Sequence, residues 1–213
     1  GWGDDADIYV LADSLLWQST EPVIKDIFEK PIITPQDETI FTIQRTDLNN
    51  FQRYKNLLFL ATLDGEGEVS QIVKNNLSPE AQQKVKEGNY VFLQKEKWAS
   101  DQLIMFLVST DSSKLIQKIQ ENQNYIFNLF DNYWNEAKKD QMYRPGREKE
   151  LEQYLIKNYG WTFEVPYDYQ IFIEKPDSNF VMLRRMLPER WLFVYWIENE
   201  DPAILSEEWV IST

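Results

Sequence analysis

Short apolar runs bounded by polar residues stand out in the first half of the chain. Residues 8–12 lie between Asp7 and Asp13, and residues 56–63 form a second run of the same kind. A continuous apolar run of roughly four to eight residues is typical of a strand that is buried on both faces of its sheet. These two runs therefore predict central strands.

The stretch between these strands predicts a broken helix. Its apolar residues have helical spacing over 14–30, but Pro22 lies too far inside for one helix, because proline lacks the backbone N–H that an interior position donates. We expect one turn of helix over 14–18, and then a helix that begins near Pro22 with Ser19 or Thr20 as its N-cap. The pattern further predicts a strand over 38–44 and a brief helix over 47–53.

The clearest helix boundary is Ser78-Pro79-Glu80, which places a capping serine, a proline at the first helical position and an acid in the first turn. Gly88 marks the predicted C-terminal end of this helix. Two β-rich runs follow, at 90–98 and 102–110, and predict a hairpin.

The longest predicted element is a helix over 111–139, where apolar residues recur at spacings of three, four and seven. At about 1.5 Å per residue it would be long enough to cross a whole sheet face. Arg144-Pro145-Gly146 interrupts it, and a second helix is predicted over 148–159, with Gly160 as its stop.

The last part of the chain predicts a series of short strands with turns between them. Such short connections favour antiparallel pairing. In the last strand, alternation sends Trp191, Phe193 and Tyr195 to one face, so we expect one aromatic set to meet either the core or a partner. The four predicted strands span residues 162–165, 169–175, 179–185 and 191–197.

This order of elements predicts an α+β fold: an antiparallel or mixed sheet covered by a long helix, with a C-terminal antiparallel meander. No linker rich in glycine, serine or proline divides the chain. We therefore expect a single compact unit over 1–213, with 144–146 as a candidate break between subdomains 1–143 and 147–213.

The amino-acid composition excludes several classes of partner, catalytic mechanism and metal site. With 22 basic and 35 acidic residues, the 213-residue chain carries a formal charge of −13, which disfavours nucleic acid as a partner. Hydrophobic residues make up 43%, enough for a folded core. The absence of histidine and cysteine removes the Ser-His-Asp and Cys-His mechanisms and thiolate metal sites.

The segment Asp64-Gly65-Glu66-Gly67-Glu68 begins like a calcium loop but departs from the EF-hand pattern. That pattern requires glycine at the sixth and glutamate at the twelfth position, where this chain has Val69 and Asn75. A solvated turn is the favoured interpretation, with ion binding as the alternative. We expect no resident metal and no cofactor, since nucleotide-binding glycine motifs are also missing.

Arg184 and Arg185, together with Arg190 beside Trp191, form the densest arginine cluster and are the candidate binding residues. Alternation points Arg184 and Arg185 to opposite faces of a strand. The favoured interpretation is that they are surface arginines paired with the protein's own carboxylates. The alternative is a binding site for a carboxylate or phosphate.

An ordered set of segments resembles an uncharacterised bacterial family of cell-envelope lipoproteins that contains a domain of unknown function. The matching segments are Asp7-Ile8-Tyr9-Val10-Leu11-Ala12-Asp13, 16–17, 22–24, 38–41, 54–58, Tyr159-Gly160-Trp161-Thr162-Phe163-Glu164-Val165-Pro166, 179–185 and 192–196. The resemblance implies a lipid-anchored protein that faces the periplasm or exterior, with its signal peptide and anchor cysteine upstream of Gly1 and a further C-terminal part beyond Thr213. It implies no catalytic residues.

Two hypotheses for the function follow. The first is a non-catalytic domain that binds or scaffolds a protein or glycan partner and meets the membrane only through an N-terminal lipid anchor. The second is a glycan hydrolase with two catalytic carboxylates. A cleft holding two acids about 5–9.5 Å apart, one of them desolvated, would support the hydrolase, whereas a flat aromatic patch would support the binding domain.

Overall fold

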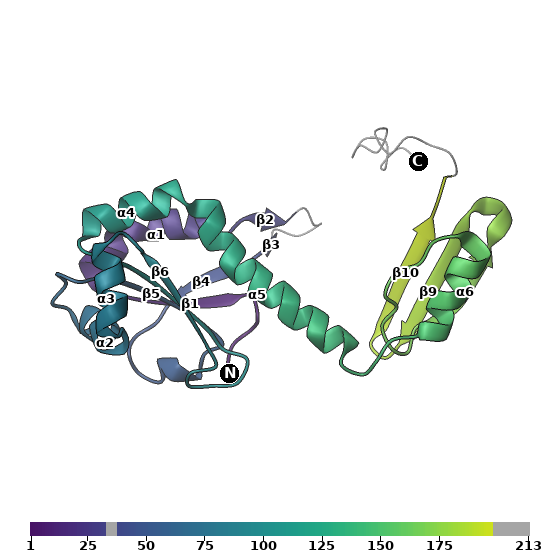
Figure 1. The fold of residues 1–213 in the computed structure, drawn as a ribbon, viewed down its shortest axis with the longest axis horizontal. Helices are drawn as coiled ribbons and strands as arrows, with labels where there is room; N and C mark the ends of the chain where they lie inside the picture. The colour runs from purple at the N-terminus through teal and green to yellow at the C-terminus, as the bar shows by residue number, and fades with distance from the viewer. Residues whose placement is uncertain (33–37, 198–213) are drawn as a thin grey trace. The chain divides into compact units, whose positions relative to one another are not determined.

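The computed structural model describes residues 1–32 and 38–197, and its packing forms two compact units (Figure 1). The first unit is Gly1–Glu136 and the second begins at Ala137. Helix α5 (Gln123–Tyr143) contains this boundary, and the expected break at 144–146 follows directly after the helix. Whether the chain behaves as one domain or two stays a prediction.

The first unit contains most of the secondary structure. Its strands are β1 (Asp7–Ala12), β2 (Pro31–Ile32), β3 (Glu38–Thr39), β4 (Thr42–Arg45), β5 (Asn56–Thr62), β6 (Val91–Lys95) and β7 (Leu103–Ser109). Its helices are α1 (Ser14–Phe28), α2 (Glu68–Asn76), α3 (Pro79–Lys86), α4 (Ser112–Glu121) and the first part of α5, with a 3-10 turn η1 (Phe51–Arg53).

A mixed five-stranded sheet forms the centre of this unit, in the order β4-β1-β5-β7-β6. Strands β4, β1, β5 and β7 are parallel, and only β6 runs antiparallel, beside β7. Every residue of β5 and β7 is buried, as expected for strands covered on both faces. The predicted mixed sheet and the predicted β6–β7 hairpin are confirmed.

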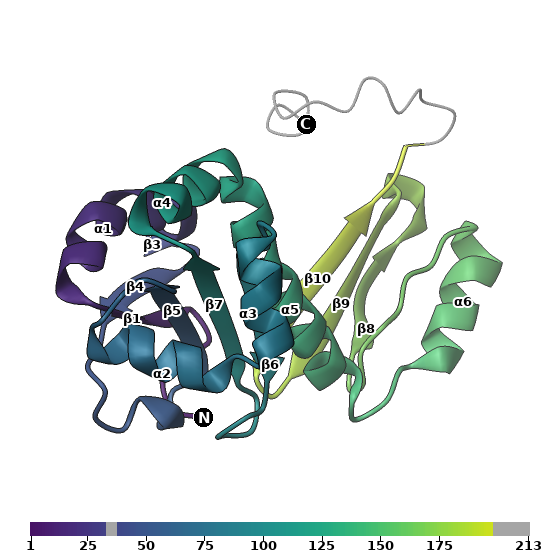
Figure 2. The ribbon, with the colours of Figure 1, turned by 60° about the vertical axis from the view of Figure 1, so that its left-hand side comes forward.

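Helices cover both faces of the sheet. Figure 2 shows α1 and α4 above it and α2 below it. On the α2 side, Val69 and Val73 of α2 and Val85 of α3 pack with Phe59 and Phe106 from the central strands. On the other side, Phe28 of α1 meets Phe130 of α5 edge to face, with 5.4 Å between ring centroids. This two-sided coverage explains the continuous apolar runs in the sequence.

The predicted break in the first helix is wrong: α1 is one helix with Pro22 inside it. Ser19 and Thr20 do not cap a second helix, because their hydroxyls donate to the carbonyls of Leu15 and Leu16 one turn earlier. Proline removes one backbone hydrogen bond, and burial of the apolar side of α1, including Ile24, outweighs that loss.

Three other boundaries differ from expectation. The long helix is divided at Asn122, whose backbone (φ −128°, ψ 28°) departs from helical geometry, so α4 and α5 are separate. The strand expected over 38–44 is two short strands, β3 paired with β2 and β4 paired with β1. The helix α2 was not expected, because the acidic glycine-rich turn before it masked its start.

The second unit is a helix packed on an antiparallel meander. Helix α6 (Lys149–Tyr159) ends at Gly160, whose φ of 75° suits glycine. Three strands follow in the order β10-β9-β8: β8 (Gln170–Lys175), β9 (Phe180–Met186) and β10 (Glu189–Tyr195), with a 3-10 turn η2 (Pro176–Ser178). Residues 162–165 form no strand, but the predicted C-terminal antiparallel meander is confirmed.

Asn56 is a fully buried polar residue at the start of β5. Its side-chain amide donates to the carbonyls of Asp5 and Asp7, and its oxygen accepts from the indole of Trp134 on α5. One side chain therefore joins the N-terminal segment, the sheet and the long helix.

We expect Asn56→Leu to lower the free energy of unfolding by about 2–4 kcal/mol, because it leaves the Trp134 N–H and two carbonyls without partners. Urea denaturation followed by tryptophan fluorescence measures this. Asn135→Ala, on the exposed side of α5, is the control and should change the unfolding free energy by less than about 0.5 kcal/mol. Equal effects of the two substitutions would contradict the assignment.

Glu152 has a similar role in the second unit, where it joins α6 to the segments that contain Arg147 and Val165. It forms two hydrogen bonds with Arg147, at 2.9 and 2.6 Å, and accepts the backbone N–H of Val165 at 2.9 Å. The Arg147 hydrogen bonds are the main reason that the pKa of Glu152 lies below its usual value, and the Val165 N–H adds to the effect.

A lowered pKa in the folded state means that Glu152 stabilises the fold fully above its unfolded pKa, near 4.5, and loses this contribution as the pH falls through the folded value. We expect Glu152→Gln to be less stable than the wild type at pH 7 and the difference to shrink below about pH 4.5. Urea midpoints measured between pH 7 and pH 3 test this. Glu150→Gln, on the exposed side of α6, is the control, and a gap that stays constant with pH would refute the assignment.

Candidate functional site

Helix α6 covers one face of the sheet of the second unit (Figure 2), and among the described residues the opposite face keeps large side chains exposed. Leu155 of α6 packs against Val181 and Leu183 of β9. Alternation sends the neighbouring side chains to the other face, where Trp191, Phe193 and Tyr195 of β10 are 48%, 66% and 51% exposed.

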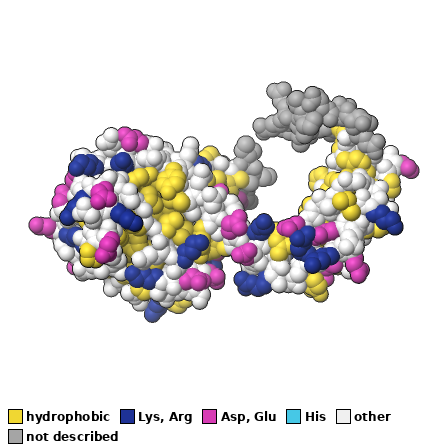
Figure 3. Space-filling view, viewed as in Figure 1, with side chains coloured by type: hydrophobic (Ala, Val, Ile, Leu, Met, Phe, Trp, Pro, Cys, Tyr) yellow, Lys and Arg dark blue, Asp and Glu magenta, His cyan; other side chains and the backbone are white. Residues whose placement is uncertain are grey.

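Residues from all three strands build this second face. Phe172 of β8 meets Trp191 edge to face at 5.0 Å between centroids, and Phe180 of β9 stacks with Phe193 at 6.2 Å. Hydrophobic side chains are visible on the surface of this unit among basic ones (Figure 3). We call this surface the aromatic face, and define it as Phe172, Phe180, Met182, Arg184, Trp191, Phe193 and Tyr195.

Arg184 lies within the aromatic face between two rings. Its guanidinium carbon is 5.0 Å from the centroid of Phe172 and 4.6 Å from that of Trp191, which is cation–π geometry. One terminal nitrogen forms an ion pair with Glu189 at 2.6 Å. The Nε atom is buried and has no hydrogen-bond partner among the described residues. The arrangement holds a donor group in place inside an apolar surface.

The structure divides the four predicted binding residues into two pairs. Arg184 and Trp191 are opposite each other in the β9–β10 register and share the aromatic face. Arg185 and Arg190 are also cross-strand partners, but alternation places them on the other face. They donate to the backbone carbonyls of Leu187 and Glu189, respectively. The binding role of all four residues stays a prediction.

Sequence reasoning did not place Phe172, Phe180 or Met182 on this face. A β-bulge between Ile171 and Ile173 shifts the register of β8, so simple alternation does not show which face Phe172 shares. The position of Met182 was predictable, because alternation along one strand puts it on the same face as Arg184. Alternation in the sequence did predict that Trp191, Phe193 and Tyr195 of β10 share one face.

Three described carboxyl groups have a pKa below the usual value: Glu80, Asp111 and Glu152. Hydrogen bonds to the ionised carboxylate are the main cause in each. A general acid for glycan hydrolysis requires a raised pKa, so these three groups do not suit that role. Over residues 1–32 and 38–197, no cluster of three or more acids is arranged to hold a metal ion.

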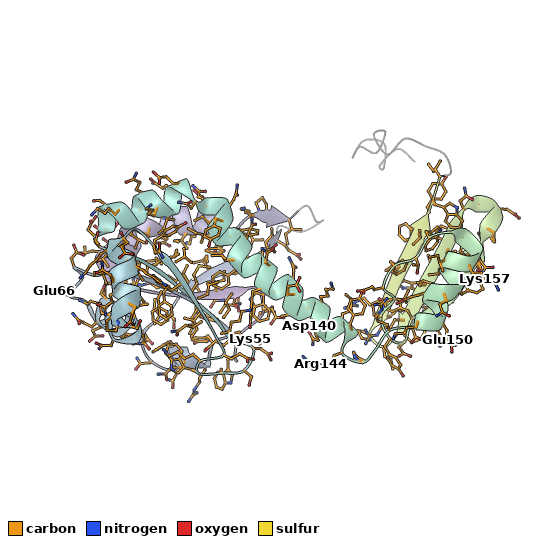
Figure 4. The ribbon with its side chains drawn as sticks, in the orientation of Figure 1. Lys55, Glu66, Asp140, Arg144, Glu150 and Lys157 are labelled. Carbon is orange, nitrogen blue, oxygen red and sulfur yellow. The ribbon has the colours of Figure 1, made fainter. Side chains whose placement is uncertain are left out.

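A crevice of about 650 Å³ lies in the first unit, at the carboxyl ends of β1 and β4. Lys55 precedes the central strand β5 and Glu66 follows it, so the two residues mark opposite ends of the strands (Figure 4), and the crevice is at the end marked by Glu66. Its lining comprises Ala12, Asp13, Ser14, Arg45, Thr46, Asp47, Leu48, Asn49, Glu68 and Val69.

Asp13 organises one wall of this crevice. Its carboxylate accepts the backbone N–H groups of Val69 and Ser70 at 3.1 and 3.2 Å and the Ser70 hydroxyl at 2.6 Å. It thereby caps α2 from a different part of the chain. A Cβ atom at Gly67 would overlap the carboxyl group of Asp13, so only glycine fits beside the cap in this arrangement.

We expect Gly67→Ala to lower the free energy of unfolding by about 1–3 kcal/mol, because the new methyl group displaces the Asp13 cap. Ser70→Ala is the matched control. It removes one of three hydrogen bonds and should cost only about 1 kcal/mol. Both values are measurable by urea denaturation, and an unchanged midpoint for Gly67→Ala would show that the cap can move without cost.

The fold and both surfaces describe a mixed α+β protein with a helix-covered sheet and an aromatic meander. Residues 2–143 match the family model of a domain of unknown function (DUF8532), and the chain belongs to this family. No curated protein and no solved structure matches the chain. Within the described part, every helix is too short or too polar to cross a bilayer.

Proposed function

We propose that the protein is a non-catalytic binding domain that docks a protein partner on the aromatic face. The observation that carries the proposal is the row of Trp191, Phe193 and Tyr195, each about half exposed or more on the sheet face opposite α6. Exposed apolar patches of this kind mark interaction sites in folded proteins.

The composition of the face favours a protein over a glycan. The centres of protein interfaces are enriched in tryptophan, tyrosine, phenylalanine, methionine and arginine, and the aromatic face contains all five. A glycan site needs many hydrogen-bonding groups beside its stacking rings. Here phenylalanine and methionine occupy four of the seven positions, and Arg184 is already paired with Glu189, which lies on the same side of the sheet.

The arrangement of Arg184 adds to this support. Its contacts with Phe172 and Trp191 restrict the side chain before a partner arrives, so less conformational entropy is lost on binding. Arginine is enriched among the residues that dominate interface energies.

We also propose a cellular location for the protein. The resemblance to envelope lipoproteins supports a chain displayed in the bacterial cell envelope on an N-terminal lipid anchor. Labelling of the full-length gene product with a radioactive fatty acid, followed by membrane fractionation, tests the anchor. A product that takes up no lipid and stays out of the membrane fraction would refute it.

A photo-crosslinker placed at position 193 tests the docking surface in the native cell. We expect p-benzoylphenylalanine at this position to give one discrete protease-sensitive adduct, because Phe193 is the most exposed ring of β10. The same group at Lys157, on α6 of the same unit, is the control and should give no such adduct (Figure 4).

The partner identified from the adduct is then purified on its own, and its affinity for the 213-residue chain is measured by calorimetry. We expect Phe193→Ser and Trp191→Ser each to weaken binding by about 30-fold or more, as for central interface residues. Lys157→Ser should leave the affinity unchanged. An adduct that resists protease but is cleaved by glycosidases would instead favour a glycan, and equal affinities for all variants would refute docking on this face.

A further inference from the structure

We infer that the crevice of the first unit binds a zwitterionic small molecule, one that carries both a carboxylate and an ammonium group, such as a free amino acid or a short peptide. This site lies in the part of the chain that matches the family, and it does not depend on the proposed function of the aromatic face.

The position of the crevice follows from the order of the strands. The connection after β1 is α1, which covers one face of the sheet, and the connection after β5 is α2, which covers the other (Figure 2). Neighbouring parallel strands whose connections diverge in this way leave an opening at their carboxyl ends, where open α/β sheets bind ligands. The crevice lining comes from both connections: Ser14 begins α1, and Glu68 begins α2.

The size of the crevice suits a small ligand. Its volume of about 650 Å³ falls within the range of pockets that hold small molecules. Most of its lining side chains are polar, and the apolar ones are Ala12, Leu48 and Val69. A compact polar molecule with a short apolar part fits this lining better than a large apolar one.

Asp13 takes no part in recognising the ligand. Both of its carboxylate oxygens are occupied by Val69 and Ser70, as the cap of α2 requires. The backbone N–H groups of Val69 and Ser70 in the first turn of α2 donate to the same cap. Recognition therefore depends on the charged side chains that remain on the other walls of the crevice.

Arg45 is the basic residue of the lining and the partner for a carboxylate. Its terminal nitrogen donates to the Ser14 hydroxyl at 3.1 Å, which fixes one edge of the guanidinium. Across residues 1–32 and 38–197, Arg45 forms no ion pair. Its remaining N–H groups are suited to a carboxylate in a two-bond arrangement.

Asp47 and Glu68 supply the opposite charge. Asp47 accepts the backbone N–H of Asn49 at 2.8 Å through one oxygen, and neither carboxylate has an ion-pair partner in the described part of the chain. A simple anion would face these two acids, and a simple cation would face Arg45. A molecule with both charges satisfies both walls.

Titration of the 213-residue chain with L-alanyl-L-alanine, followed by amide chemical shifts in nuclear magnetic resonance, tests the inference. We expect saturable shifts at Ser14, Thr46 and Val69. Acetate and methylammonium, which carry one charge each, should bind at least about tenfold more weakly, since each lacks one charge-assisted contact. Free L-alanine and L-leucine extend the series.

Two substitutions assign the contacts. Arg45→Met keeps the length of the side chain and should weaken dipeptide binding by about tenfold or more, and Asp47→Asn should have a smaller effect in the same direction. Arg144→Met is the matched control, because it removes an exposed arginine in the other unit and should leave the affinity unchanged (Figure 4).

Crevice shifts that Arg45→Met removes and Arg144→Met keeps would establish the site. The absence of crevice shifts with all zwitterionic probes up to about 10 mM, a level that reveals even weak binding, would overturn it. Equal binding of acetate and the dipeptide would overturn the zwitterion and leave a plain anion site.

Discussion

The constraint that shapes this protein is that a β-sheet has two faces and both contain side chains. In the first unit, helices α1 and α4 cover one face and α2 the other, so β5 and β7 are buried along their whole length. In the second unit, α6 covers one face of a three-stranded sheet. Within the described residues, the opposite face exposes aromatic side chains where a solvated face would hold polar ones, and for this reason it is the proposed docking surface.

Polar side chains that make several hydrogen bonds hold the elements of the first unit in register. Asn56 connects the N-terminal segment, β5 and α5, and Asp13 joins the end of β1 to the start of α2. Such groups are costly to bury alone and stabilising only when all their hydrogen bonds are made. The same Asp13 contacts position α2 beside the crevice, so the stability of α2 and the shape of the crevice have a common cause.

The two surfaces suit different ligands. The aromatic face is a broad apolar area with one guanidinium held between rings, which is appropriate for a large partner. The crevice is an open polar depression whose charges of both signs, Arg45, Asp47 and Glu68, form no ion pair within the described residues, which is appropriate for a small one. The family match covers the unit that contains the crevice, and the aromatic face lies beyond it.

The sequence by itself determined the features that depend on local spacing. The buried runs of β1 and β5, the capped start of α3, the β6–β7 hairpin and the C-terminal meander all follow from periodicity and turn residues. Alternation also placed Trp191, Phe193 and Tyr195 on one face. Only the tertiary structure decided the rest. Packing kept α1 whole around Pro22, a bulge brought Phe172 to the aromatic face, and parallel pairing joined Ser14, Arg45 and Glu68 around one crevice. These outcomes depend on contacts between distant residues, which no local pattern records.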